Sequence, residues 1–160
     1  MGHIISFTGN SNSGKTTIIE KLISSLTEEG YKIGTVKHAH KGFELDKSGK
    51  DSFRHMEAGA EMVIIADPEK IHITKKIKID TFANLKPYFT EMDLIIVEGY
   101  KKESIPQIPI IQDRSADRFL YVNNPCVVAL ISDINTDCRL PVFKRNDTDS
   151  LRQFIKDAFL

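Results

Sequence analysis

Several features that mark other classes of protein are missing from this chain of 160 residues. Basic and acidic residues number 22 each, so the chain lacks the excess of Lys and Arg with which most proteins bind nucleic acid or an anionic membrane surface. No apolar run approaches the roughly 18 to 20 residues that a membrane-spanning helix needs. Residues 1–4 lead straight into a strand-like run, so we expect no signal peptide. We therefore predict one cytoplasmic domain over residues 1–160 that binds neither nucleic acid nor membrane.

Cysteine is also scarce. The chain has two cysteines, Cys126 and Cys138, and their spacing does not fit a zinc site. Cys126 precedes an apolar run and is predicted to be a buried thiol in a strand, whereas Cys138 lies among polar residues of a predicted loop. Free thiols fit a reducing cytoplasm, and a disulfide is the less favoured alternative.

Short β-branched runs alternate with longer segments of helical periodicity, and this alternation predicts an α/β fold. The continuous apolar runs at 94–97 and 127–131 are typical of parallel strands that are covered on both faces. The predicted strands are residues 3–8, 33–37, 94–97 and 127–131, and the predicted helices are residues 15–29, 48–60, 81–90 and 147–159.

Two further segments complete this prediction. Residues 62–66 and 70–74 flank a Pro-containing turn and are predicted to pair as a hairpin, which would add an antiparallel element to an otherwise parallel sheet. Residues 100–112 contain Pro106 and Pro109. We expect a solvated loop there, with a docking surface or an extra edge strand as alternatives.

The segment between the first strand and the first helix has the spacing of a phosphate-binding loop. Residues 9–16 match the pattern G-x-x-x-x-G-K-[ST], in which backbone N–H groups and the start of a helix face a phosphate. Lys15 is predicted to reach the β- and γ-phosphates, and the Thr16 hydroxyl to ligate Mg²⁺. A glycine-rich turn that happens to contain a Lys is the alternative. The predicted nucleotide-binding residues here are Gly9, Asn10, Ser11, Asn12, Ser13, Gly14, Lys15, Thr16 and Thr17.

A second acidic residue is predicted to complete this site. Glu98 follows the apolar strand 94–97 at its carboxyl end, where a carboxylate can hold Mg²⁺ or orient an attacking water. Asp93 stands at the opposite end of that strand and is more consistent with a cap or a solvent-facing side chain. Glu98 and Lys15 are therefore the predicted catalytic residues, and Glu98 joins Thr16 as a predicted metal ligand.

The segment after the second strand is predicted to reach the same edge of the sheet. Lys37 and His38 are predicted to sense an anion there, and Asp46 is a further candidate metal ligand, with Asp51 as its alternative. His38 and His40 could form a metal pair, but no clear third ligand follows, so this reading is disfavoured. A solvated loop of mixed charge is the alternative for the whole segment.

With these residues in place, the chain resembles the MobB family, the GTP-binding adaptor proteins of molybdopterin-guanine dinucleotide biosynthesis. The resemblance covers nearly the whole chain, and the ordered set of motifs is more specific than any one of them. The matching segments are TGNSNSGKTT (residues 8–17), TVKH (35–38), DKSGKDSFRH (46–55), AGA (58–60) and VEGYK (97–101).

The resemblance implies a three-layer phosphate-loop (P-loop) NTPase fold, GTP with Mg²⁺, weak hydrolysis and a homodimer. It also implies partnership with the molybdenum cofactor guanylyltransferase, in which the family supports attachment of GMP to molybdopterin rather than catalysing it. Carried over by position, Gly14, Lys15 and Thr16 bind phosphate and Mg²⁺, and Glu98 is the acid at the end of the strand.

Two positions depart from the patterns of related NTPases. The Asn-Lys-x-Asp element of many guanine-specific NTPases is replaced by Ser132-Asp133-Ile134-Asn135, which lacks the lysine. Asp133 is the predicted contact to guanine, with an exposed turn Asp as the alternative. Asn10 stands where relatives that donate a lysine across a dimer carry it, so activation by that route is not expected.

Two functions remain open on this sequence. The favoured one is a GTP-binding adaptor with slow turnover. The alternative is a small-molecule kinase on the same scaffold, in which Lys37 or Arg54 would neutralise the transferred phosphoryl group.

Overall fold

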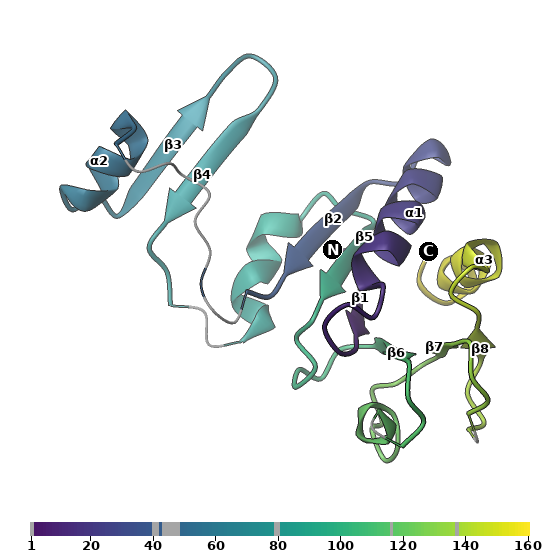
Figure 1. Cartoon of the computed structure of the whole chain (residues 1–160). Coiled ribbons are helices and arrows are strands. Elements are labelled where there is room, and N and C mark those ends of the chain that lie inside the picture. The colour runs from purple at the N-terminus through teal and green to yellow at the C-terminus, as the bar shows by residue number, and fades with distance from the viewer. Residues whose placement is uncertain (1, 40–41, 43–48, 79–80, 116, 137) are drawn as a thin grey trace. The chain divides into compact units, whose positions relative to one another are not determined.

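The computed structural model of the chain divides into two units. Residues 1–38 together with 81–160 make the larger one, and residues 39–80 make the smaller one (Figure 1). The prediction that one domain spans residues 1–160 stays a prediction. Within the described ranges, no helix is both long enough and apolar enough to cross a membrane. The structure describes residues 2–39, 42, 49–78, 81–115, 117–136 and 138–160.

A six-stranded sheet lies at the centre of the larger unit. Its strands are β1 (His3–Thr8), β2 (Ile33–Lys37), β5 (Leu94–Glu98), β6 (Gln107–Ile111), β7 (Leu130–Ser132) and β8 (Val142–Phe143). They run in the order β2-β5-β1-β6-β7-β8, and each neighbouring pair is parallel. Residues 94–97 of β5 are all buried, as the continuous apolar run predicted.

Helices cover both faces of this sheet. α1 (Lys15–Glu28) and α3 (Thr148–Phe159) contact each other on one face, and the 3₁₀ helix η1 (Phe82–Phe89) packs on the other. Along β5, Leu94 and Ile96 join the cluster under α1 and α3, whereas Ile95 and Val97 pack with Phe82 of η1. The predicted three-layer α/β fold with a mostly parallel sheet is confirmed.

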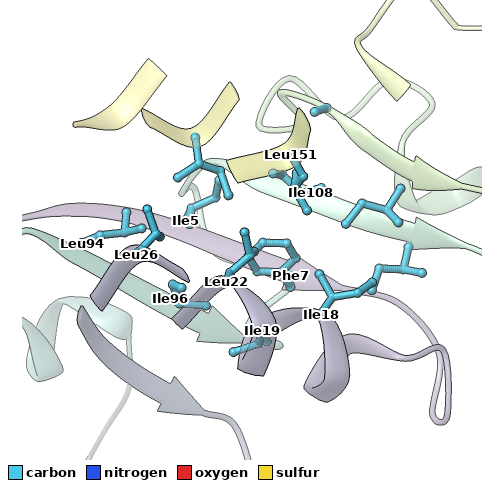
Figure 2. Close-up of a cluster of buried hydrophobic side chains, with 14 residues drawn as sticks. Ile5, Phe7, Ile18, Ile19, Leu22, Leu26, Leu94, Ile96, Ile108 and Leu151 are labelled. Atoms are coloured by element: carbon cyan, nitrogen blue, oxygen red, sulfur yellow. The ribbon is translucent and has the colours of Figure 1, made fainter. Parts of the chain in front are cut away.

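The main core lies between the sheet and α1. Phe7 of β1 is fully buried, and Ile18 and Leu22 of α1 lie against it (Figure 2). Apolar residues recur at helical spacing along α1 and supply this face. Leu151 of α3 closes the same cluster. This packing anchors the first turn of α1 beside the end of β1, where the predicted phosphate loop lies.

The prediction for residues 100–112 was wrong, because residues 107–111 form the buried strand β6. We expected a solvated loop, an edge strand or a docking surface, because Pro106 and Pro109 weaken the strand pattern. Instead, all five residues of β6 are buried, and β6 is an inner strand between β1 and β7. Burial of its apolar side chains outweighs the single ladder hydrogen bond that a proline removes.

Pro109 also explains why β7 is shorter than the strand predicted over 127–131. The N–H of Gln107 donates to the carbonyl oxygen of Cys126, but Pro109, two residues further on, has no N–H to continue that ladder. Regular pairing of β6 with β7 resumes at the residue after Pro109. Cys126 therefore lies in a turn before β7 and is only partly buried, not in a strand as predicted, and both cysteines are free thiols.

The smaller unit contains α2 (Asp51–Glu57) and a hairpin of β3 (Met62–Ala66) and β4 (Ile71–Lys75). β3 and β4 pair antiparallel as predicted, but they form a two-stranded sheet of their own. The prediction that this hairpin extends the parallel sheet was therefore wrong. The alternation of apolar residues indicates that two strands pair, but it carries no information on which sheet they join.

Replacing Leu22 by Ala tests the core that supports α1. Leu22 is completely buried, so the truncation leaves a cavity under Phe7 and should lower the free energy of unfolding by about 2 to 5 kcal/mol. Urea denaturation measures this change. The exposed Lys21 on the same helix is the control, and Lys21→Ala should change the free energy by less than about 0.5 kcal/mol. Equal effects of the two variants would contradict this core.

Candidate functional site

The loop predicted to bind phosphate, residues 9–16, connects β1 to α1. Gly14 caps the helix with a φ of 89°, a conformation that other residues rarely adopt. Gly9 is needed for a second reason, because a Cβ there would lie 3.0 Å from Ser13 Oγ and 3.1 Å from the carbonyl oxygen of Ile110. The two glycines of the motif therefore hold the loop in its bend.

Most amides of this loop remain available to an anion. The N–H of Ser13 donates to the carbonyl oxygen of Asn10 at 3.3 Å. In the part of the chain that the structure describes, no other N–H of residues 9–16 donates to a carbonyl oxygen. The first turn of α1 adds further N–H groups without helical partners and the positive end of the helix dipole. This is the arrangement that a phosphate-binding loop requires.

Lys15 lies across the loop. Its Nζ donates to the carbonyl oxygen of Asn10 at 2.7 Å, to that of Gly9 at 3.3 Å and to Ser13 Oγ at 3.2 Å. The ammonium group is thus held over the loop by oxygen atoms, which phosphate oxygens can replace.

Glu98 brings residues from three elements together. It ends β5, opposite Phe7 of β1 and Lys37 of β2. Its Oε2 accepts a hydrogen bond from Thr16 Oγ1 at 3.4 Å and lies 3.7 Å from Lys37 Nζ. The Glu98 side chain is only 18% exposed, whereas that of Lys37 is 70% exposed. The parallel register therefore places Lys37 beside Glu98, and the first turn of α1 adds Thr16 to the same cluster.

The charges of this cluster act on one another. Partial burial of the ammonium lowers the pKa of Lys15 below its ordinary value. The neighbouring carboxylate of Glu98 opposes this shift, and the positive charge of Lys37 adds to it. A triphosphate would relieve the repulsion between the two lysines, because its negative charge pairs with both.

The residues present fit the predicted Mg²⁺. Thr16 and Glu98 supply a hydroxyl and a carboxylate, the hard oxygen ligands that Mg²⁺ prefers, and Mg²⁺ commonly takes few protein ligands and completes its shell with phosphate and water. The buried hydroxyl of Thr8, directly before the loop, has no hydrogen-bond partner among the described residues, as expected where a ligand or water completes a site. The described residues contain no group of three or more His, Cys, Asp or Glu that could hold a metal ion, so a Mg²⁺ ion here would depend on phosphate and water for the rest of its shell.

The remaining candidate residues lie elsewhere in the chain or outside the residues that the structure describes. Asp93 is exposed at the amino end of β5, where its carboxylate accepts the N–H of Lys32 at 2.8 Å. His38 stacks on Tyr100 with ring centroids 4.3 Å apart. Asp46 and His40 lie outside the described residues, so their predicted roles stay predictions.

Two buried polar residues that the sequence analysis missed hold the backbone around the site. Ser6 Oγ donates to the carbonyl oxygen of Gly99 at 2.5 Å and so ties the residue after Glu98 to β1. The carboxylate of Asp117 accepts a hydrogen bond from the side chain of Asn10 in the phosphate loop. No motif points to either residue, because each contact joins segments distant in sequence.

Asp133, the predicted guanine contact, follows β7, and its carboxylate is paired with Arg145. Its Oδ1 accepts the backbone N–H of Arg145 at 3.0 Å, and its Oδ2 accepts Arg145 Nε at 2.5 Å. These bonds, chiefly the one from the backbone, hold the pKa of Asp133 below its ordinary value. A guanine base would have to displace the guanidinium to reach the carboxylate.

Replacing Arg145 by Ala tests this ion pair. The pKa of Asp133 should rise towards, without reaching, its ordinary value of 3.8, because the backbone N–H remains. Since the folded-state pKa is depressed, the stabilisation from Asp133 is present above pH 3.8 and is lost as the pH falls through the folded pKa. Carboxyl NMR titration measures the shift, and an unchanged Asp133 titration would contradict the pair. Arg139→Ala is the matched control.

Comparison with known proteins agrees with the resemblance seen in the sequence. Residues 4–133 match the family described as MobB, "Molybdopterin guanine dinucleotide synthesis protein B". The chain is 31% identical to the "Molybdopterin-guanine dinucleotide biosynthesis adapter protein" of Escherichia coli over 158 residues, which is 95% of this chain and 90% of that protein. It is 41% identical to the Haemophilus influenzae protein of the same name over 109 residues, 66% of this chain and 61% of that protein.

Solved structures show the same likeness. The chain is similar to the structure described as "The Crystal structure of Bacillus subtilis MobB", with a TM-score of 0.83, 27% identity, and coverage of 99% of this chain and 98% of that one. A second, "Crystal Structure of molybdopterin-guanine biosynthesis protein B (mobB)", aligns with a TM-score of 0.79 at 25% identity over 96% of this chain and 98% of that one.

Proposed function

The chain belongs to the MobB family, and on this basis we propose that it is a GTP-binding adapter of molybdopterin-guanine dinucleotide biosynthesis with weak Mg²⁺-dependent GTPase activity. The observation that carries the nucleotide part of the proposal is the contact of Glu98 with Thr16 beside the Lys15 loop. The relatives' names supply the adapter part.

In this proposal the amides of residues 9–16 and the Lys15 ammonium bind the phosphates. Thr16 and Glu98 hold Mg²⁺, and Thr17 lies near the α-phosphate. Lys37 senses the γ-phosphate through its pairing with Glu98. Asp133 receives the base once Arg145 has moved aside, and Asp46 remains a proposed outer ligand of the metal.

Weak hydrolysis follows from how Glu98 is held. Its carboxylate accepts a hydrogen bond from Thr16 and lies beside the Lys37 ammonium. A carboxylate in those contacts is placed to hold a metal ion and is not free to take a proton from an attacking water. We therefore propose that the protein acts in the cytoplasm mainly by binding the molybdenum cofactor guanylyltransferase, rather than by turning over GTP.

Calorimetric titration with Mg²⁺ present tests the nucleotide site. GTP should bind more tightly than ATP, and Lys15→Ala should weaken GTP binding about 10- to 100-fold, because it removes charge-assisted hydrogen bonds to phosphate. Lys21→Ala, on the exposed side of the same helix, is the matched control and should bind GTP like the wild type.

Two outcomes would overturn different parts of this proposal. Equal affinity for GTP and ATP would remove the guanine assignment and the role of Asp133. Unchanged binding in Lys15→Ala would remove the phosphate loop itself.

A homodimer is the second part of the proposal, and the hairpin supports it. Met62, Ile64, Ile71 and Ile73 lie on the same face of the β3–β4 sheet, because the register pairs Ile64 with Ile73 and Ala66 with Ile71. These four side chains are between 44% and 64% exposed. A contiguous apolar face of this kind usually marks an interface, and a second copy presents the same face for a self-complementary contact.

Light scattering tests the dimer. The wild-type chain should scatter as a dimer, and the double variant Ile64→Lys/Ile73→Lys should scatter as a monomer, because it places two charges at the centre of the apolar face. Tyr88→Lys is the control, since Tyr88 is 52% exposed but lies on η1. A monomeric wild type, or a dimer that survives the double substitution, would contradict this interface.

A further inference from the structure

Asp117 is a buried carboxylate that none of the motifs explains. The residue is 1% exposed and lies directly before η2 (Arg118–Leu120), after the end of β6. Its Oδ2 accepts the backbone N–H groups of Gln112 at 2.7 Å and Asp113 at 3.0 Å. Its Oδ1 accepts Asn10 Nδ2 at 2.5 Å. One carboxylate thus joins the loop after β6 to the phosphate loop, 107 residues away in sequence.

Asn10 is the residue through which this contact reaches the site. The carbonyl oxygen of Asn10 accepts both the N–H of Ser13 at 3.3 Å and the Nζ of Lys15 at 2.7 Å. The peptide of Asn10 therefore sets the position of one loop amide and of the ammonium group together. Any force that holds the Asn10 side chain also limits the movement of that peptide.

The chemistry of the two side chains decides which atom of the Asn10 amide faces Asp117. An ionised carboxylate only accepts hydrogen bonds, so Asp117 requires the amide nitrogen of Asn10, and not its oxygen, to face it. Hydrogen bonds to a charged acceptor are shorter and stronger than neutral ones. A further contact, from Gln112 Nε2 to the carbonyl oxygen of Asn12 at 3.5 Å, links the same two loops.

We propose that Asp117 is a positioning residue for the phosphate loop, which holds Asn10 so that Ser13 and Lys15 are set for triphosphate before it binds. This inference rests on the proposed nucleotide binding. Preorganisation of this kind raises affinity because the loop loses less conformational freedom when the ligand arrives. The competing interpretation is that Asp117 only stabilises its own loop through Gln112 and Asp113.

A swap of the two side chains separates these interpretations. Asn10→Asp places two carboxylates against each other and should weaken binding of Mg²⁺-GTP and of inorganic triphosphate by at least about tenfold. Asp117→Asn alone should also weaken binding, but less than Asn10→Asp, because the Asn10 amide can rotate and accept from the new amide while the charge-assisted bond is lost. The double variant Asn10→Asp/Asp117→Asn restores a carboxylate–amide pair with the wild-type net charge, and it should recover most of the lost affinity.

Calorimetry on the full chain measures all four proteins, and thermal unfolding is recorded for each. Asp113→Asn is the matched control, since it makes the same charge change in the same loop at a side chain that accepts hydrogen bonds from Ser115. If the Asp117 variant does not fold, Asn10→Ala replaces it, because Asn10 is an exposed residue, and about tenfold weaker triphosphate binding is expected.

Each outcome of these titrations either supports the inference or overturns it. Recovery in the double variant beyond the product of the two single effects supports the inference. Independent effects of the two substitutions, changes seen only in the unfolding midpoint, or wild-type affinity in Asn10→Ala would overturn it while the proposed function stands. A wild-type chain that binds neither Mg²⁺-GTP nor triphosphate would overturn both.

Discussion

The parallel pairing of β1 with β5 on one side and β6 on the other is the constraint on which the site depends. Parallel strands end at the same edge of a sheet, so the phosphate loop after β1 and Glu98 at the end of β5 must lie side by side. β2 adds Lys37 at the same level. If β1 slipped by one residue, Phe7 would turn to the opposite face of the sheet, away from α1, and Thr16 would move away from Glu98.

The core and the site are therefore parts of one arrangement. Phe7 packs against α1 from near the carboxyl end of β1, and α1 in turn presents its first turn to the loop. Buried polar side chains then hold the backbone at the site. Ser6 donates a hydrogen bond to the carbonyl oxygen of Gly99, and Asp117 accepts one from Asn10. Apolar packing decides where the strands end, and a few buried hydrogen bonds decide how the backbone bends there.

Some of these features could be predicted because their signal is local. The loop motif needs only a strand before it, a helix after it and two glycines, and all of these are consecutive in sequence. The position of Glu98 was also predictable, because it directly follows a continuous apolar run and so stands at the carboxyl end of a buried strand. The position of β6 was not, because Pro106 directly before it and Pro109 within it argue against an inner strand, while the burial that outweighs them involves β1 and β7.

The sequence by itself determined the alternation of strands and helices, the loop of residues 9–16 with its glycines and lysine, and membership of the MobB family. Tertiary structure alone decided that the hairpin forms a separate sheet, that Arg145 pairs with the carboxylate of Asp133, and that Asp117 accepts a hydrogen bond from Asn10. The reason is physical. Propensity and periodicity act between residues a few positions apart, whereas these three features depend on which distant segments share a surface.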